Sequence, residues 1–286
     1  MDLKAVNAYI KQVEESEKKV LHTAGERLKV GVDLGTAYIV IVVLDEGDNP
    51  VACEKRAASV LRDGVVVDFV GAQRIVGELK ATLESRMGRE LTQCAIAMPA
   101  GTESSTKTHM YVAESAGFEV IRVLDEPTAA NAIYHISNGA IVDIGGGTTG
   151  LAVFRDGEVI RIADEATGGV HLTLVLAGNM GISFEEAERL KMDFSNHKKL
   201  FPVIKPVIEK MASIVKNHIN RDETDVIYLC GGTCCMTGIE QVFEKEVGIT
   251  AIKPANPFLV TPTGIAMNCF AKPSGQKEVI LCNSVR

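Results

Sequence analysis

Two segments of the chain, about 110 residues apart, each place an aspartate before a glycine-containing turn. The first segment contains Asp33, Gly35, Thr36 and Ala37. The second contains Asp143, Gly145, Gly146, Gly147 and Thr148. Successive backbone amides in such a turn form a concavity for an anion, and glycine lets a phosphate approach closely. A carboxylate beside phosphates needs a cation, so Asp33 and Asp143 are expected to hold water bound to Mg²⁺.

The residues around both segments predict the same succession of strand, turn and strand. Apolar, β-branched runs at 28–34 and 38–44 flank the first turn, and runs at 140–144 and 151–154 flank the second. Either segment alone is equally well explained as an ordinary β-hairpin, whereas the pair predicts a site that holds one polyphosphate from both sides. We therefore expect a duplicated α/β unit whose two lobes face each other across a cleft, where ligands of such sheets bind.

The spacing of apolar residues predicts the elements that connect these strands. Further strands are expected at 51–55, 94–98, 118–124, 159–162 and 225–230. Helices are expected at 70–87, 103–115, 128–137, 169–179, 183–192, 201–219, 238–246 and 262–270. In this interpretation residues 28–139 form the first lobe, which residues 259–286 complete, and residues 140–258 form the second lobe.

The pattern over residues 1–27 predicts a separate amphipathic helix. Leu3, Val6, Ile10 and Val13 recur at spacings of three and four, while lysines and glutamates occupy the other face. This apolar stripe would pack on the surface of the protein itself, or it would dock into a groove of a partner. The sequence leaves both alternatives open.

The composition excludes several classes of protein. The 286 residues include 30 Lys and Arg against 37 Asp and Glu, a net charge of −7, and no basic cluster that could bind nucleic acid stands out. Hydrophobic residues make up 46 %, which is too many for a disordered chain. No apolar run approaches the roughly 18 residues of a membrane span, and the charged N-terminus is unlike a signal peptide. We expect a soluble protein.

The cysteines predict the redox environment. Their number, seven, is odd, and Cys94 and Cys230 lie in apolar runs where small buried thiols are common. This usage favours a reduced, cytoplasmic protein over a disulfide framework. Cys234 and Cys235 follow Cys230 closely, but they lack the spacing and the nearby histidine of a metal site, so a metal site is disfavoured there.

Four motifs in a fixed order resemble the actin-like ATPase superfamily, and the pattern of DnaK-type nucleotide-binding domains is the nearest. They lie at 31–36, 125–130, 143–148 and 230–233. The resemblance implies a duplicated, ribonuclease-H-like, two-lobed fold with a central nucleotide cleft. The insertion subdomain of the first lobe would be reduced, because only about 55 residues separate the first loop from Cys94. The compact size and the run 184–191 resemble the EutJ family, chaperone-like proteins of ethanolamine-utilisation operons.

The resemblance implies catalytic roles for four residues. Asp33 and Asp143 match the carboxylates that hold hydrated Mg²⁺ and neutralise the phosphates. Glu126 matches the carboxylate that orients the attacking water, although it could also only cap the helix that begins at Pro127. Thr148 matches the residue that hydrogen-bonds the γ-phosphate region.

The same resemblance implies which residues contact the nucleotide. They are Gly35, Thr36, Ala37, Gly145, Gly146, Gly147, Gly168, Gly169, Glu188, Lys191, Gly231, Gly232 and Thr233. Glu188 and Lys191 would reach the ribose and adenine, or they would be an ordinary solvent-facing pair. Cys235 stands where DnaK proteins carry an arginine against the base, and their lysine from the insertion subdomain has no match here. Ala129, Ala130 and Gly264 are expected to let two helices cross closely between the lobes.

These roles imply ATP, ADP and Mg²⁺ as ligands and a slow, Mg²⁺-dependent ATPase with a chaperone-like role. Closure of the lobes would be read by a client or shell protein of the ethanolamine-utilisation microcompartment, which would place the protein in the cytoplasm or at that compartment. One alternative is a self-associating, nucleotide-dependent filament or scaffold protein like MreB or FtsA. Others are a small-metabolite kinase and a scaffold that binds ATP without hydrolysing it.

Overall fold

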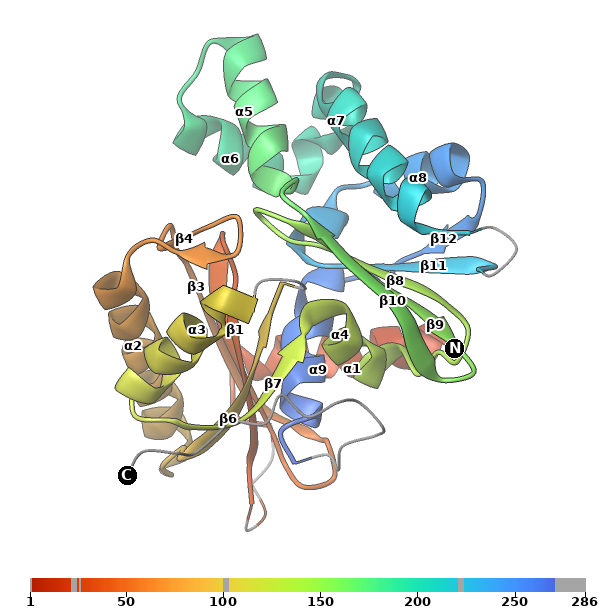
Figure 1. Ribbon diagram of the computed structural model, residues 1–286. Helices are drawn as coiled ribbons and strands as arrows, with labels where there is room; N and C mark the ends of the chain where they lie inside the picture. Colours follow the sequence, from red (N-terminus) through yellow and green to blue (C-terminus); the bar gives the residue numbers. More distant parts are fainter. Residues whose placement is uncertain (1, 22–24, 26, 100–102, 221–223, 271–286) are drawn as a thin grey trace.

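The computed structural model describes residues 1–286 except 1, 22–24, 26, 100–102, 221–223 and 271–286 (Figure 1). In this part of the chain, two five-stranded sheets have the orders β3-β2-β1-β6-β7 and β10-β9-β8-β11-β12. The first three strands of each sheet are antiparallel and the last two join parallel to the central strand. The equal orders confirm the expected duplication.

The first lobe is a sheet covered on its outer face by two helices. Its strands are β1 (Lys29–Leu34), β2 (Tyr38–Leu44), β3 (Pro50–Ala57), β6 (Gln93–Met98) and β7 (Glu119–Asp125). The covering helices are α2 (Phe69–Met87) and α3 (Glu103–Ser115). Asp68 caps α2 by accepting a bond from the Gly71 N–H, and Gly88 ends it in the left-handed conformation. The short strands β4 (Leu61–Arg62) and β5 (Val65–Val66) form a hairpin that the sequence pattern does not predict.

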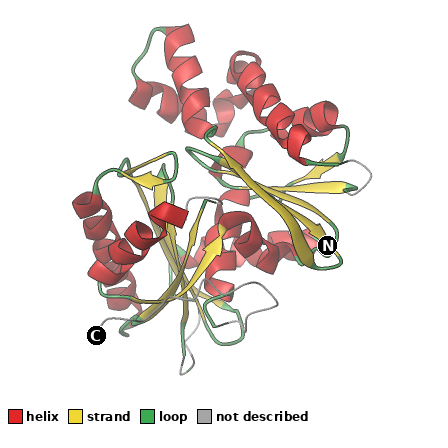
Figure 2. Ribbon diagram, viewed as in Figure 1, coloured by secondary structure: helices red, strands yellow, loops and turns green. Residues whose placement is uncertain are grey.

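The second lobe repeats the arrangement with more helices on its far side (Figure 2). Its strands are β8 (Gly139–Ile144), β9 (Thr149–Arg155), β10 (Glu158–Glu165), β11 (Val226–Cys230) and β12 (Thr250–Ile252). Its helices are α5 (Gly169–Met180), α6 (Phe184–Met192), α7 (His197–His218) and α8 (Ile239–Val247), with the 3₁₀ turns η1 (Phe194–Asn196) and η2 (Gly232–Cys235). Side chains of α5, α7 and α8 pack with β8, β9 and β11 into one apolar core.

Two helices cross between the sheets, α4 (Glu126–Tyr134) and α9 (Val260–Met267), and the 3₁₀ turn η3 (Pro257–Leu259) leads into α9 (Figure 1). A Cβ atom added at Gly264 would lie far inside van der Waals contact with the carbonyl oxygen of Ala129. At this point the two backbones therefore touch, as the small residues predict. Helix α9 also packs on β1, where Gly31 leaves the room for its backbone.

The N-terminal helix α1 (Leu3–Ser16) is shorter than predicted. It ends at Ser16 because the chain then runs beside β3, where the Leu21 N–H donates to the carbonyl oxygen of Val51 at 3.0 Å. Residues 22–24 and 26 lie outside the described residues. The apolar stripe is buried in a core that joins side chains of both lobes, and Asn7 Oδ1 accepts a 2.7 Å bond from the Ala255 N–H. The stripe thus packs on this chain and does not form an open docking face.

Other predicted elements are present with shifted ends. Helix α4 stops at Tyr134 because His135 adopts the left-handed conformation, and α7 begins at His197 rather than at residue 201. The final helix α9 ends at Met267 instead of residue 270. The described cysteines are free thiols: Cys53, Cys94, Cys230, Cys234, Cys235 and Cys269. In the described part of the chain, every helix is too short or too polar to cross a membrane.

Candidate functional site

Carboxylates from both lobes gather where the two sheets approach each other. Asp33 lies near the end of β1 and Asp143 near the end of β8, the equivalent strand of the other lobe. Burial and the charge of Asp143 raise the pKa of Asp33 to about 7. Burial and the charges of Asp143, Asp33 and Asp164 raise the pKa of Glu126 well above its usual range. This concentration of negative charge is unfavourable unless a cation or protons neutralise it.

The carboxylate of Glu126 is not used to cap helix α4. Asp125 is the N-cap residue, and its side chain accepts a 2.8 Å bond from the Thr128 N–H. The alternative role as a helix cap is therefore wrong, and Glu126 stands in the first helical turn with its carboxylate among the other acidic groups.

Asp143 is fixed by residues that lie more than 85 positions further along the chain. The Thr261 hydroxyl of α9 donates to Asp143 Oδ2, and only glycine fits at position 231, where a Cβ would collide with Asp143 Oδ1. Gly231 also has a φ of +88°, which other residues rarely adopt. Sequence reasoning missed Thr261, since nothing in its local pattern distinguishes it from other threonines at the start of a helix.

The two predicted phosphate loops are in direct contact. A Cβ at Gly146 would lie 3.0 Å from the Cβ of Ala37, and a Cβ at Gly147 would lie 2.8 Å from the Thr36 hydroxyl. The same Cβ at Gly147 would lie 2.9 Å from the Cα of Asp63, in the turn between β4 and β5. Glycine is required here by the close approach of the first lobe.

Three glycine segments of the second lobe also meet backbone to backbone. The carbonyl oxygen of Gly145 accepts bonds from the Gly169 N–H at 3.0 Å and from the Thr233 hydroxyl at 2.7 Å. A Cβ at Gly168 would lie 2.6 Å from the carbonyl oxygen of Gly146, and one at Gly232 would lie 3.2 Å from the ring of Phe258. The predicted loops at 145–147, 168–169 and 231–233 therefore form one continuous surface.

Lys191 points inward to this surface. Its Nζ donates to the carbonyl oxygen of Gly169 at 3.1 Å and to the Thr173 hydroxyl at 2.9 Å, and it pairs with Glu188 at 2.7 Å. Its side chain is 11 % exposed, and burial lowers its pKa. The alternative of a solvent-facing pair is therefore wrong. The Thr173 hydroxyl also donates to Glu188, and sequence reasoning missed Thr173 because it looks like an ordinary helix residue.

Cys235 lies half-buried at the end of η2, and burial raises the pKa of its thiol. Lys253 holds this turn, because its Nζ donates to the carbonyl oxygens of Cys234 at 2.8 Å and Met236 at 2.9 Å.

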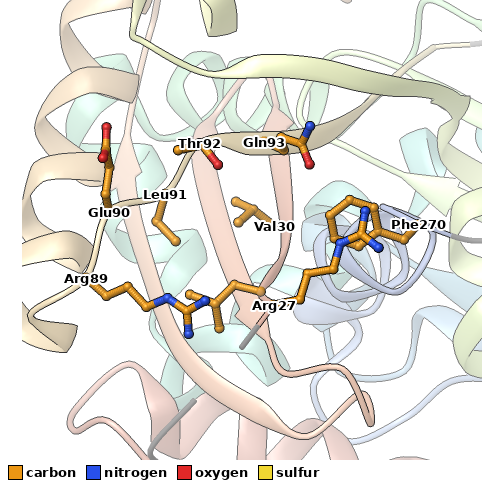
Figure 3. Close-up of a pocket in the computed structure, with 9 residues that line it drawn as sticks. Arg27, Val30, Arg89, Glu90, Leu91, Thr92, Gln93 and Phe270 are labelled. Atoms are coloured by element: carbon orange, nitrogen blue, oxygen red, sulfur yellow. The ribbon is translucent and has the colours of Figure 1, made fainter. Parts of the chain in front are cut away.

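A separate cavity of about 110 Å³ lies at the other end of the first lobe (Figure 3). It is lined by Arg27, Leu28, Val30, Arg89, Glu90, Leu91, Thr92, Gln93 and Phe270, none of which is a predicted site residue.

Comparison with known proteins places this geometry in a family. Residues 110–264 match the family described as type IV pilus assembly protein PilM. The chain is 43 % identical to ethanolamine utilization protein EutJ of Escherichia coli (strain K12) over 249 residues, which cover 87 % of this chain and 88 % of that protein. The crystal structure of EutJ from Carboxydothermus hydrogenoformans is 44 % identical and covers 93 % of this chain and 99 % of that one, with a TM-score of 0.87. The chain belongs to the EutJ family.

The EutJ family fold is shared with more distant proteins. MreB 5 of Spiroplasma citri, in a structure bound to AMPPNP, superposes with a TM-score of 0.68 at 19 % identity, over 85 % of this chain and 96 % of that one. The identity is low, so this likeness concerns the fold alone. It confirms the predicted two-lobed, actin-like ATPase architecture.

In this EutJ family chain, the structure brings the predicted site residues together in two groups. The carboxylates and the loop at 145–147 meet the loop at 35–37, whereas Lys191 and Glu188 lie on the far side of Gly169. The acidic group offers only oxygen donors, which suit Mg²⁺. Among the described residues, no group of three or more His, Cys, Asp or Glu side chains is arranged to hold a metal ion directly.

Proposed function

We propose that this chain binds ATP and ADP with Mg²⁺ at the lobe interface and hydrolyses ATP slowly. The observation that carries the proposal is the meeting of two aspartate–glycine loops, one from each lobe, around buried carboxylates. Burial and the charge of Asp143 disfavour the ionised form of Asp33, and burial disfavours that of Asp143, so a cation between them would be strongly favoured. The contact of Gly146 and Gly147 with Thr36 and Ala37 supports a phosphate-binding role for both loops.

When bound, Mg²⁺ would neutralise charge on the phosphates and lower the pKa values of the nearby carboxylates. Asp33 and Asp143 would hold it through water. Glu126, once ionised, would accept a hydrogen bond from the attacking water and orient it. Lys191 and the turn at Gly231 would bind the nucleoside end. The lysine that DnaK proteins project from their insertion subdomain has no match in the sequence, which supports slow turnover.

Binding would move the lobes. Because the loops at 35–37 and 145–147 touch, a phosphate group between them requires that they separate. Helices α4 and α9 cross with their backbones in contact at Ala129 and Gly264, so this crossing would act as the pivot. Nucleotide binding and release would therefore change the angle between the lobes.

This movement would be read by a partner protein. Membership of the EutJ family supports a role in ethanolamine utilisation. This role would be chaperone-like, in the cytoplasm or at a bacterial microcompartment, with a client or shell protein as the partner. The hairpin of β4 and β5 touches Gly147 through Asp63, and Val65 in this hairpin is 45 % exposed. It would connect the phosphate site to the surface of the first lobe.

Calorimetric titration with MgATP tests the proposal directly. The wild-type chain should bind MgATP at micromolar to millimolar concentration, and Asp143→Asn should weaken binding at least about tenfold. Glu185→Gln, at an exposed position on α6, is the control and should bind like the wild type. Binding that is absent at millimolar MgATP would refute the proposal. Release of phosphate measures hydrolysis, and sedimentation with and without MgATP tests for filaments.

A further inference from the structure

His197 is a buried histidine at the first position of α7. Its side chain is 4 % exposed, and its ring packs beside the ring of Phe194 with 4.9 Å between the two centroids. The 3₁₀ turn η1 separates it from the end of α6, the helix that carries Lys191. A buried imidazole is costly unless its nitrogen atoms have hydrogen-bond partners, so the partners of this ring show what it holds together.

Each ring nitrogen of His197 bonds a different backbone segment. Nε2 lies 3.0 Å from the carbonyl oxygen of Lys191, in the last turn of α6, where carbonyl groups have no partner within the helix. Nδ1 lies 3.1 Å from the backbone nitrogen of Thr237 and 3.0 Å from its hydroxyl oxygen. The ring thus joins the end of α6 to the segment 231–237, which contains η2 and which we call the 231–237 turn.

These partners determine the state of the ring. A carbonyl oxygen can only accept, so Nε2 carries a proton and donates it to Lys191, whereas the Thr237 N–H can only donate, so Nδ1 is unprotonated. Burial lowers the pKa of His197, against the effect of its bond to Lys191. The charge of Lys253 acts with burial, and that of Asp193 acts against it. The neutral ring is the form that holds both segments.

The same two segments meet again at the nucleoside end of the proposed site. A Cβ at Gly169 would lie 2.5 Å from the Thr233 hydroxyl oxygen and 3.4 Å from Lys191 Nζ. Thr233 belongs to the 231–237 turn and Lys191 to α6, so the two segments reach one small area of backbone with their side chains. A shift of α6 relative to the turn would therefore change the distance between Lys191 and Thr233, and the bonds of His197 resist such a shift.

We propose that His197 is a positioning residue for the nucleoside end of the bound nucleotide, because it fixes α6 relative to the 231–237 turn. The inference rests on the proposed nucleotide-binding function and deepens it. Without the ring, Lys191 and the glycines of the turn would no longer be held at the spacing that lets both contact one nucleoside. In the described part of the chain the ring bonds these two segments and not the loops at 35–37 and 145–147, so binding of the phosphates should not depend on it.

The experiment compares two ligands by calorimetry: MgATP and the magnesium complex of inorganic tripolyphosphate, which has three phosphates and no nucleoside. His197→Leu keeps an apolar side chain and removes both hydrogen bonds. It should raise the Kd for MgATP about tenfold and change the Kd for magnesium tripolyphosphate less than about twofold. His218→Leu, in the last turn of the same helix, is the matched control, because His218 lies beside Glu165 and not at the turn. It should bind both ligands like the wild type.

His197→Gln is the conservative variant and covers the case in which His197→Leu lowers the stability of the fold. Its amide offers one donor and one acceptor for the Lys191 carbonyl oxygen and the Thr237 N–H, so it should recover part of the affinity for MgATP. An unchanged Kd for MgATP in His197→Leu overturns the inference. An equal loss of affinity for both ligands also overturns it, because the residue would then only support the fold, and so does a His197→Gln variant that binds MgATP as weakly as His197→Leu. A wild-type chain that does not bind MgATP refutes the proposed function instead, so the two failures are distinguishable.

Discussion

Replacing Asp33 by asparagine should make the nucleotide-free protein more stable, because the site is unfavourable without a cation. Burial and the charge of Asp143 raise the pKa of Asp33 from 3.8 to about 7. The folded protein therefore retains, between these two values, a proton that the unfolded chain has released. Its stability must fall as the pH rises through this interval, and the full cost is present above about pH 7.

The magnitude follows from the same shift. A difference of about three pKa units corresponds to about 4 kcal/mol, which is the most that Asp33→Asn can gain at pH 8. At pH 4 the unfolded chain has only begun to release the proton of Asp33, so the variant should gain much less than at pH 8, and well below pH 3.8 the group is protonated in both states and the gain vanishes. The sign is opposite to that of a salt-bridged aspartate, whose removal costs stability at neutral pH.

Urea denaturation without nucleotide or Mg²⁺, at several values between pH 4 and pH 8, measures this difference. The control is Asp225→Asn at an exposed position, which should change the free energy of unfolding by less than about 0.5 kcal/mol at every pH. Lower stability of Asp33→Asn at pH 8, or a difference that is the same at pH 4 and pH 8, would refute the reasoning. With MgATP present the order should reverse, since the variant loses the group that holds the cation.

Three further predictions concern the elements around the site. Gly264→Ala should lower the free energy of unfolding by about 3 kcal/mol or more, because the new Cβ collides with Ala129. Its control is Gly178→Ala in α5, which has open space around it and should leave the free energy of unfolding unchanged or raise it by up to about 1 kcal/mol. Urea denaturation measures both. Ile10→Ala, in the same assay, should cost about 2 to 5 kcal/mol, because Ile10 is buried between the lobes. Lys191→Met should weaken MgATP binding about tenfold in calorimetry without slowing single-turnover hydrolysis of bound ATP.

Each of these predictions has a result that contradicts it. A stable Gly264→Ala variant would mean that α4 and α9 can move apart freely. An unchanged Ile10→Ala variant would mean that α1 is not docked in solution. Slower hydrolysis with unchanged affinity in Lys191→Met would assign this residue to the chemical step instead of the nucleoside end.

The sequence predicted the parts of the site that depend on local pattern. Asp33 and Asp143 each follow an apolar run and precede glycines, so strand ends and turns could be assigned without knowledge of the fold. The acidic residue Asp164, whose charge also raises the pKa of Glu126, could not be found in this way, because its place depends on its pairing with Gly150 across a hairpin that contains a bulge between Val159 and Arg161. From the sequence alone, an aspartate at the end of a strand with many polar residues is expected to face solvent.

Other features of the structure that the sequence did not predict also depend on contacts between distant segments. The inward direction of Lys191 depends on how α6 packs against α5, which the spacing from Glu188 does not determine. Thr261 meets Asp143 only because α9 returns to the first lobe. The end of α1 at Ser16 follows from backbone pairing of the next residues with β3. This pairing competes with continuation of the helix, and it cannot be deduced from the spacing of apolar residues.

The place where helix α1 docks has a consequence for the order in which the parts of the molecule fold. The helix precedes in the chain every element on which it packs, yet Asn7 bonds to Ala255, a residue 248 positions later, and the apolar stripe lies in a core that combines side chains of both lobes. Strand β3 offers the helix a contact that is near in sequence, but its full binding site forms only when the segment around residue 255 has folded onto it, so until then part of the stripe stays available to other apolar surfaces. Complete docking of α1 is therefore a late step in folding, and a chain cut short before residue 255 would hold the helix through its contacts with the first lobe alone.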